Sequence, residues 1–137
     1  MSQKGGALER MAGPIKLNAG AALGSGKQYV PWIHSDDLCR IFIKGIEDNT
    51  MKGVFNAVAP NPVTNELLTK EIAKVLNKSI ILPNIPAFIL KLILGEFSSS
   101  VIGGERVSSK KIQSAGFVFE YETIENALKN LLSGGSQ

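Results

Sequence analysis

Residues 28–38 of the 137-residue chain read QYVPWIHSDDL and hold its only Trp, its only His and one of its two Tyr residues. Two sets of side chains alternate over residues 29–34, and this period of two predicts a strand with amphipathic side chains on both faces. Ser35 is a typical N-cap, and the two aspartates after it suit the first turn of a helix. Ligands of open α/β sheets bind at the carboxyl ends of strands, so we expect any site near Trp32 and His34.

A strand–helix–strand unit is predicted around this stretch. Apolar residues recur at helical spacing after residue 37, so a helix that buries one face is expected there. Residues 53–59, GVFNAVA, read as a second and mostly buried strand. A unit of this kind predicts parallel strands. The predicted buried face of the helix comprises Leu38, Ile41, Phe42, Gly45 and Ile46.

Helical patterns dominate the remainder of the chain. Thr64 or Asn65 is expected to cap one helix, and Thr123 is expected to cap the last one. A short strand or extended piece is expected at residues 79–82 and a strand at residues 117–121, with a brief strand pairing at Val107. The other predicted helices span residues 7–12, ended by Gly13-Pro14, residues 87–94, residues 97–102, and residues 109–114, capped by Ser108.

The helix predicted over residues 87–94, AFILKLIL, is apolar almost all round. Such a helix is covered on several sides or lies at an interface. Three alternatives follow for it: burial within a larger parent protein, a self-association surface, or membrane insertion.

Composition excludes several classes of function. The hydrophobic content of 44% supports one compact domain, and a net charge of +3 with interleaved signs offers no basic stripe for nucleic acid. Cys39 is the only cysteine, which excludes a disulfide or a cysteine metal site and favours a reducing compartment. The N-terminus lacks a signal-peptide pattern, and no apolar run is long enough to span a membrane. We therefore expect a soluble cytoplasmic protein without a membrane partner.

The small-residue loop at residues 18–26, NAGAALGSG, invites comparison with a phosphate-binding loop. The Walker pattern requires Gly at position 21 and Ser or Thr at position 28, where this chain has Ala21 and Gln28. The glycine spacing does not fit the dinucleotide fingerprint either. The loop is therefore expected to be a connection into the next strand, or alternatively the lining of a substrate cleft.

Several motifs in succession resemble one family. The segment G-x-G-K-Q at residues 24–28 and W-I-H-x-x-D-L at residues 32–38 are similar to the later part of atypical extended short-chain dehydrogenase/reductases, the nucleoside-diphosphate-sugar epimerase family. The C-terminal half adds P-x-x-x-L-x-L-x-L-G-E from residue 86 and G-F-x-F-x-Y from residue 116. Further matching residues are Gly5, Gly6, Ala7, Asn56, Pro60, Pro62, Arg106, Val107, Lys110, Ala127 and Leu128.

The resemblance implies an α/β fold: the C-terminal βαβ part of a Rossmann-type parallel sheet, followed by a small, mostly helical lobe. Residues 1–62 correspond to a remnant of the Rossmann-type domain with a substrate-side loop, and residues 63–137 to the substrate-side lobe. The parent family implies NAD(P) and a small-molecule substrate such as a nucleotide-sugar. The partner expected for this chain is therefore a missing N-terminal Rossmann half, and a homo-oligomer remains an alternative.

The family's catalytic features are missing from this chain. It has no glycine-rich fingerprint, and no Y-x-x-x-K pair, because Ile33 stands four residues after Tyr29 and Glu125 four residues after Tyr121. We therefore predict no catalytic, cofactor-binding or metal-binding residue, and no catalysis by this chain alone. The rival hypothesis is a non-catalytic interaction or dimerisation module.

Five residues are candidates for substrate contact: Lys27, Gln28, Trp32, His34 and Arg106. His34 could act as a general base, contact substrate or make a structural hydrogen bond. Trp32 could stack on a sugar or base, or fill the core. Lys27 could meet a diphosphate, or be a solvated loop charge. Arg106 could face an anion, or pair with Glu96 or Glu105.

Overall fold

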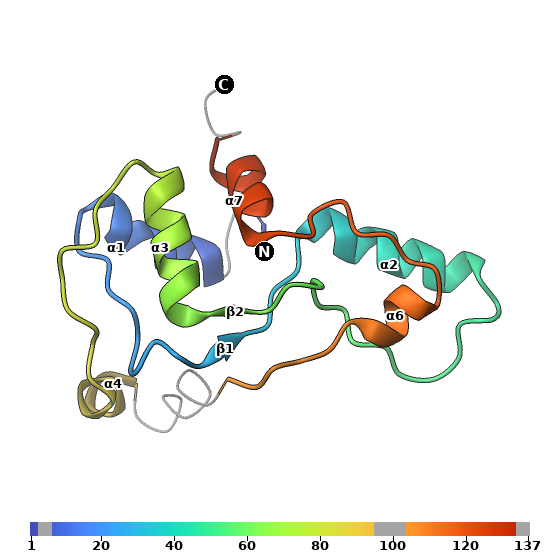
Figure 1. Ribbon diagram of the computed structural model, residues 1–137, viewed down its shortest axis with the longest axis horizontal. Coiled ribbons are helices and arrows are strands. Elements are labelled where there is room, and N and C mark those ends of the chain that lie inside the picture. Colours follow the sequence, from blue (N-terminus) through green and yellow to red (C-terminus); the bar gives the residue numbers. More distant parts are fainter. Residues whose placement is uncertain (3–6, 95–103, 134–137) are drawn as a thin grey trace.

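The computed structural model describes residues 1–2, 7–94 and 104–133, and these form a mostly helical protein with a small two-stranded sheet (Figure 1). The elements, in chain order, are α1 (Ala7–Lys16), β1 (Tyr29–Val30), α2 (Ser35–Glu47), β2 (Val63–Thr64), α3 (Asn65–Val75), α4 (Ala87–Leu94), α6 (Lys110–Ser114) and α7 (Ile124–Ser133).

Two groups of helices lie on either side of the small sheet. Helices α1, α3 and α7 gather at one end, α2 and α6 lie at the other, and α4 stands apart from both groups (Figure 1). Each group has its own apolar cluster. The segment from β1 to the start of α2 connects them.

The sheet differs from the parallel unit predicted from the sequence. β1 pairs antiparallel with β2, with Tyr29 opposite Thr64 and Val30 opposite Val63. Residues 53–59 form no strand, and only the N–H of Ala59 reaches back to the first segment, at 2.7 Å from the carbonyl oxygen of Trp32. A strand requires a neighbour that pairs with its backbone groups. Within the described residues, the bond from Ala59 is the only backbone pairing of the 53–59 segment.

The larger apolar cluster lies between α1, α3 and α7. Leu68 and Ile72 of α3 are fully buried in it, as are Ala127 and Leu128 of α7. Thr64, one of the two residues predicted to cap this helix, is the N-cap of α3. Its Oγ1 accepts a hydrogen bond from the N–H of Leu67 at 3.3 Å. Trp32 and Ala59 also belong to this cluster. The larger cluster therefore contains residues from both predicted domains, 1–62 and 63–137. The domain boundary at residue 62 stays a prediction.

The smaller cluster holds α2 against α6 and the segment that follows it. It consists of Ile41, Ile112, Phe117 and Phe119. The two Phe rings meet edge to face, with their centroids 4.9 Å apart. Residues 117–121 alternate between buried and exposed as predicted, but they are extended without forming a strand.

Three local expectations are corrected. α1 continues to Lys16 instead of ending at Gly13-Pro14, because Ile15 beyond the proline is buried in the larger cluster and holds the last turn in place. α6 begins at Lys110 and not at Ser109, although Oγ of Ser108, the predicted cap, does accept the N–H of Lys110 at 3.3 Å. Val107 forms no strand; the isolated bridge in the structure joins Leu23 to Ile85 instead.

Residues 79–82 are extended without strand pairing, and the helix predicted over residues 97–102 lies outside the described residues. Among the helices that the structure describes, none combines the length and the apolar character that crossing a membrane requires.

Candidate functional site

His34 lies at the junction of the β1 segment and α2, where the sequence predicts a site. It is buried, and it caps α2: its Nδ1 accepts the N–H of Asp36 at 3.1 Å. The helix thus begins at Ser35, and the prediction of Ser35 as the N-cap is wrong. Because Nδ1 accepts, the ring proton of neutral His34 lies on Nε2, which donates to Oδ1 of Asn130 at 3.1 Å.

The ring of His34 also stacks on Tyr121, with centroids 3.7 Å apart and planes inclined by 21°. Desolvation raises the pKa of the Tyr121 hydroxyl, and the nearby carboxylate of Glu120 adds to that shift. Both ring nitrogens and one ring face of His34 are therefore engaged within the chain. Of the three roles considered for this residue, the structural hydrogen bond has the most support.

Asp37 is the buried charge of this junction. Its Oδ1 accepts the N–H of Glu120 and its Oδ2 the N–H of Tyr121, both at 2.9 Å. Arg40 donates to Oδ1 at 2.8 Å and to the carbonyl oxygen of Val118 at 3.0 Å. The start of α2 is thereby joined to the segment before α7. Sequence reasoning treated this aspartate only as a first-turn residue, and its i,i+3 spacing to an arginine was the available signal.

Trp32 fills the larger core cluster. Only 4% of its surface is exposed, and its Nε1 donates to the carbonyl oxygen of Asn61 at 2.9 Å. A buried Trp usually finds a partner for its N–H in this way. In this chain the indole is thus a core residue that fixes the approach to β2.

Lys27 and Gln28 end the small-residue loop. The side chain of Gln28 donates to the carbonyl oxygen of Leu23 at 2.8 Å, which braces the loop. Lys27 is exposed, and its backbone N–H donates to Oγ of Ser25 at 3.2 Å. Gln28 therefore shapes the loop, while the ammonium group of Lys27 is accessible to a ligand.

Arg106 is exposed and reaches β1 from a distant part of the sequence. Its guanidinium lies 5.9 Å from the centroid of the Tyr29 ring. Gly104 passes so close to Tyr29 that an added Cβ would collide with the carbonyl oxygen of that residue. Arg106 and Trp32 line one cavity of about 10 Å³. That volume holds at most a single water, so the cavity is not a sugar site.

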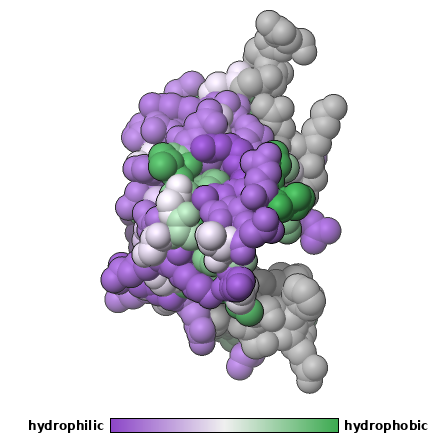
Figure 2. Space-filling model, turned by 90° about the vertical axis from the view of Figure 1, so that its right-hand side faces the viewer, coloured by the Kyte–Doolittle hydropathy of each residue, from purple (hydrophilic) through white to green (hydrophobic). Residues whose placement is uncertain are grey.

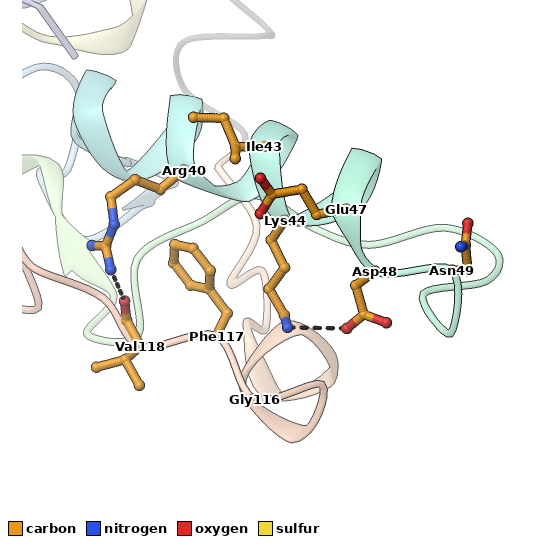
Figure 3. A pocket seen from close by; sticks show the side chains of 9 residues that line it. All are labelled: Arg40, Ile43, Lys44, Glu47, Asp48, Asn49, Gly116, Phe117 and Val118. Carbon is orange, nitrogen blue, oxygen red and sulfur yellow. Dashed lines mark hydrogen bonds and ion pairs between the residues drawn. The ribbon is translucent and has the colours of Figure 1, made fainter.

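A cavity of about 610 Å³ lies between α2 and the 116–118 segment (Figure 3). Arg40 and Lys44 extend from α2 on either side of the Phe117 ring. Both cations have partners, because Lys44 meets Oδ2 of Asp48 at 3.1 Å and Arg40 meets the Val118 carbonyl. A hydrogen bond from Thr50, followed by the one from Lys44, lowers the pKa of Asp48 to about 2.

None of the five predicted substrate-contact residues lines the cavity beside Phe117. Arg106 and Trp32 line the same small cavity beside β1, whereas Lys27 lies on the loop and His34 at the start of α2. They form no single pocket among the described residues. Substrate contact by these residues therefore stays a prediction.

A second sizeable cavity, of about 550 Å³, opens beside the start of α2, and we call it the junction cavity. Its lining is mainly apolar and includes Trp32, Ile33, Leu38, Ala57 and Val58. The described residues contain no cluster of three His, Cys, Asp or Glu side chains able to hold a metal ion. The junction cavity therefore offers mainly apolar surface, and the N-terminal ammonium of Met1, one of its lining residues, donates to the carbonyl oxygen of Ile33 at 2.6 Å.

Comparison with family models places residues 85–131 in a domain of unknown function, DUF1731. That match covers α4, α6 and all of α7 except its last two residues.

Two curated relatives are similar over nearly the whole chain. The epimerase family protein SDR39U1 homolog of Arabidopsis thaliana, described as chloroplastic, is 36% identical over 132 residues, which are 96% of this chain and 38% of that protein. Epimerase family protein YfhF of Bacillus subtilis is 38% identical over 128 residues, or 93% of this chain and 42% of YfhF. The chain thus spans less than half the length of these relatives.

Two solved structures also match nearly the whole of this chain with less than half of their own length. Human epimerase family protein SDR39U1 (isoform 2), crystallised with NADPH, matches 97% of this chain with a TM-score of 0.91 and 28% identity, over 45% of its own chain. A nucleoside-diphosphate sugar epimerase from Corynebacterium glutamicum matches 96% of this chain with a TM-score of 0.70 and 26% identity, over 24% of its own chain.

Proposed function

Because this chain corresponds to the C-terminal part of epimerase family proteins, we propose that it is the substrate-side part of an NAD(P)-dependent nucleoside-sugar epimerase or reductase-like protein. Alone, it does not catalyse a reaction. The observation that carries this proposal is the match of 97% of the chain to 45% of a protein crystallised with NADPH. Residues 28–62 then contribute the final part of a Rossmann-type sheet once the rest of that sheet is present.

The cofactor is held by the part of the family that this chain does not match. The sequence has neither a glycine-rich fingerprint nor a Y-x-x-x-K pair. Hydride transfer requires a bound nicotinamide and a positioned acid or base, and both come from the remainder of the parent protein. The role left to this chain is to close one side of the substrate pocket.

Two exposed cations support a substrate-side role. Lys27 precedes Gln28 on the loop into β1, and Arg106 lies over the ring of Tyr29 in the same strand. Cationic side chains are the usual partners of a diphosphate. In this proposal Lys27 and Arg106 contact the substrate, while the buried His34 and Trp32 act as positioning residues and Gln28 holds the loop.

A second candidate function is an interaction or dimerisation module. It is favoured by α4, which stands apart from both helix groups and exposes Phe88 and Leu92 on one side (Figure 1). Light scattering of the purified chain separates the two candidates, because a stable dimer that dissociates on Leu92→Glu supports the module.

The test of the main proposal is titration of the 137-residue chain with NADPH and with UDP-glucose, followed by Trp32 fluorescence and by calorimetric heat. We expect no saturable binding of either ligand. Saturable NADPH binding by the chain alone overturns the proposal, because a complete cofactor site would then exist within it.

The same titration extends to a chimera in which this chain replaces the matching part of YfhF. There we expect NADPH to bind, and Lys27→Ala to weaken binding of UDP-glucose without affecting that of NADPH. Lys16→Ala is the matched control, since Lys16 is an exposed lysine at the far end of α1. Equal effects of the two substitutions contradict the role given to Lys27.

A further inference from the structure

A small apolar cavity lies between α1, α3 and the loop at residues 18–26, and we call it the loop cavity. Its volume is about 140 Å³. An engineered apolar cavity of about 150 Å³ stays dry and binds benzene. The loop cavity therefore has room for one small ring or a short alkyl chain. Its apolar lining consists of Met11, Pro14, Ile15, Ala21, Leu23 and Ile85.

Two polar residues complete the lining, and they differ in their engagement. Thr69 is buried, and its Oγ1 donates to the carbonyl oxygen of Asn65 at 2.8 Å. Arg10 is exposed, and within the described part of the chain no hydrogen bond or ion pair engages its guanidinium. The loop cavity thus combines an apolar interior with an available cation at its opening.

The sequence of α1 gives a physical reason for a cavity at this place. Arg10 and Pro14 are four residues apart, as are Met11 and Ile15, so these pairs are neighbours on the helix surface. Pro14 lies inside the helix. A proline there donates no backbone N–H, and its ring presses on the preceding turn. Both effects favour looser packing on this side of α1.

The loop that forms the opposite wall is fixed at both ends. A Cβ added at Gly20 would collide with the side chain of Ile15, so the loop touches α1 there. The N–H of Leu23 donates to Oδ1 of Asn65 at 2.7 Å, and Ile85 exchanges two backbone hydrogen bonds with the loop, both at 2.8 Å. The walls therefore exist before a ligand arrives, and a preformed site loses little conformational entropy on binding.

Apolar surface at the other end of the molecule is open instead of enclosed. Figure 2 views the molecule from the end where α2 and α6 lie, and it shows hydrophobic patches within a largely hydrophilic surface. Phe42 is 66% exposed and Ile46 81% exposed, so the prediction that these two residues of α2 are buried is wrong. In the cavity beside Phe117, both lining cations already have partners. The loop cavity differs because Arg10 is available to a ligand.

We infer that the loop cavity binds a small carboxylate whose apolar part is a single ring or a short alkyl chain. The apolar part lies between α1, α3 and the loop, and the carboxylate accepts hydrogen bonds from Arg10. A guanidinium donates two parallel N–H groups to a carboxylate, which makes arginine a preferred partner of this group. The site lies within this chain, so the inference goes beyond the proposed function and requires neither NADPH nor a nucleotide-sugar.

Benzoate is the probe, because its ring has the size of the interior. It is titrated into the 137-residue chain, and binding is followed by NMR of the methyl groups. We expect saturable shifts at Leu23 and Ile85, with a Kd on the order of 1 mM for so small a ligand. Benzamide has the same shape without the charge and is expected to bind at least tenfold more weakly. No saturable shift at these methyl groups, or equal affinities for benzoate and benzamide, overturns the inference.

Paired substitutions test the interior. Ala21→Leu fills the cavity and is expected to abolish benzoate binding. Ala19→Leu is its control, because Ala19 is exposed on the same loop and lies outside the lining. Circular dichroism checks that both variants are folded. Undiminished binding by folded Ala21→Leu overturns the inference.

A second pair tests the cation. Arg10→Ala is expected to weaken benzoate binding at least tenfold and to leave benzamide binding unchanged. Lys16→Ala, which removes another exposed cation of α1, is expected to change neither. Equal effects of the two substitutions overturn the inference. This pair decides the question if Ala21→Leu does not fold, because both of its residues are exposed.

The result is independent of the proposed function. Benzoate binding by the chain alone supports the inference even where the chimera binds no NADPH. NADPH binding by the chimera supports the proposed function even where benzoate does not bind. Benzoate shifts confined to residues of α2 assign the ligand to another cavity and overturn the inference.

Discussion

Helices α2 and α3 have the same kind of amphipathic sequence and opposite surroundings. Leu68 and Ile72 of α3 are fully buried between α1 and α7, whereas Phe42 and Ile46 of α2 are largely exposed. Both helices begin at a side chain that accepts a backbone N–H, and both carry acidic residues in the first turn. Periodicity therefore determines which side of a helix is apolar, and the rest of the protein determines whether that side is covered.

The largest effect expected is the loss of a core side chain from α3. Leu68→Ala removes a fully buried leucine and is predicted to lower the free energy of unfolding by about 2–5 kcal/mol. Ile46→Ala in α2 is predicted to change it by less than about 0.5 kcal/mol, because that side chain is already in water. Urea denaturation followed by circular dichroism measures both. Similar losses for the two substitutions would break the comparison.

The link between α2 and the C-terminal segment gives the next effect. Asp37→Asn keeps the shape but replaces an acceptor by a donor facing a backbone N–H, at an expected cost of about 1–3 kcal/mol. Asp36→Asn is the control, since the side chain of Asp36 is 61% exposed. The same denaturation experiment applies. Equal stability of the two variants would show that the buried carboxylate does not hold α2 in place.

A smaller effect is expected from strengthening α2 itself. Gly45 lies inside the helix, and a Cβ added there meets nothing within 4 Å. Gly45→Ala is therefore predicted to raise the free energy of unfolding by up to about 1 kcal/mol, because alanine is the better helix former. Thermal unfolding of the chain measures it. A lower Tm would mean that something already packs against this part of α2.

The smallest effect concerns pH at the end of α2. Hydrogen bonds from Thr50 and then Lys44 hold the pKa of Asp48 at about 2, below its ordinary value of 3.8. A lowered pKa in the folded state means that the carboxylate stabilises the fold above pH 3.8, and that this contribution disappears as pH falls from there toward 2. The small Tm difference between wild type and Asp48→Asn should vanish over that range. A Tm difference between the two proteins that stays constant from pH 6 to pH 2 would show that protonation of Asp48 is not coupled to folding.

Local sequence signals predicted the local structure well. The start of a helix next to residue 35, the cap at Thr64 and the burial of Phe117 and Phe119 all follow from interactions between near neighbours. The N-cap preference predicted the wrong residue at the start of α2. Serine is the commoner N-cap, but here the imidazole of His34 accepts the free N–H of Asp36.

Long-range pairing could not be read from these patterns. The composition of residues 53–59 is typical of a strand, yet a strand forms only where another backbone lies alongside, and none does among the described residues. The two backbone bonds to Asp37 likewise depend on residues 120 and 121, more than 80 positions away. The sequence therefore indicated where His34 and Trp32 lie, at the start of α2, but not what their side chains do. Both side chains form hydrogen bonds within the protein.

The most direct measurement is a calorimetric titration of NADPH into two samples side by side, the 137-residue chain and its chimera with the unmatched part of YfhF. If the chain is the substrate-side part of a longer protein, the chimera binds NADPH with a defined stoichiometry and the chain alone gives only the heat of dilution. Saturable binding by the chain alone, or none by a folded chimera, would contradict the proposal.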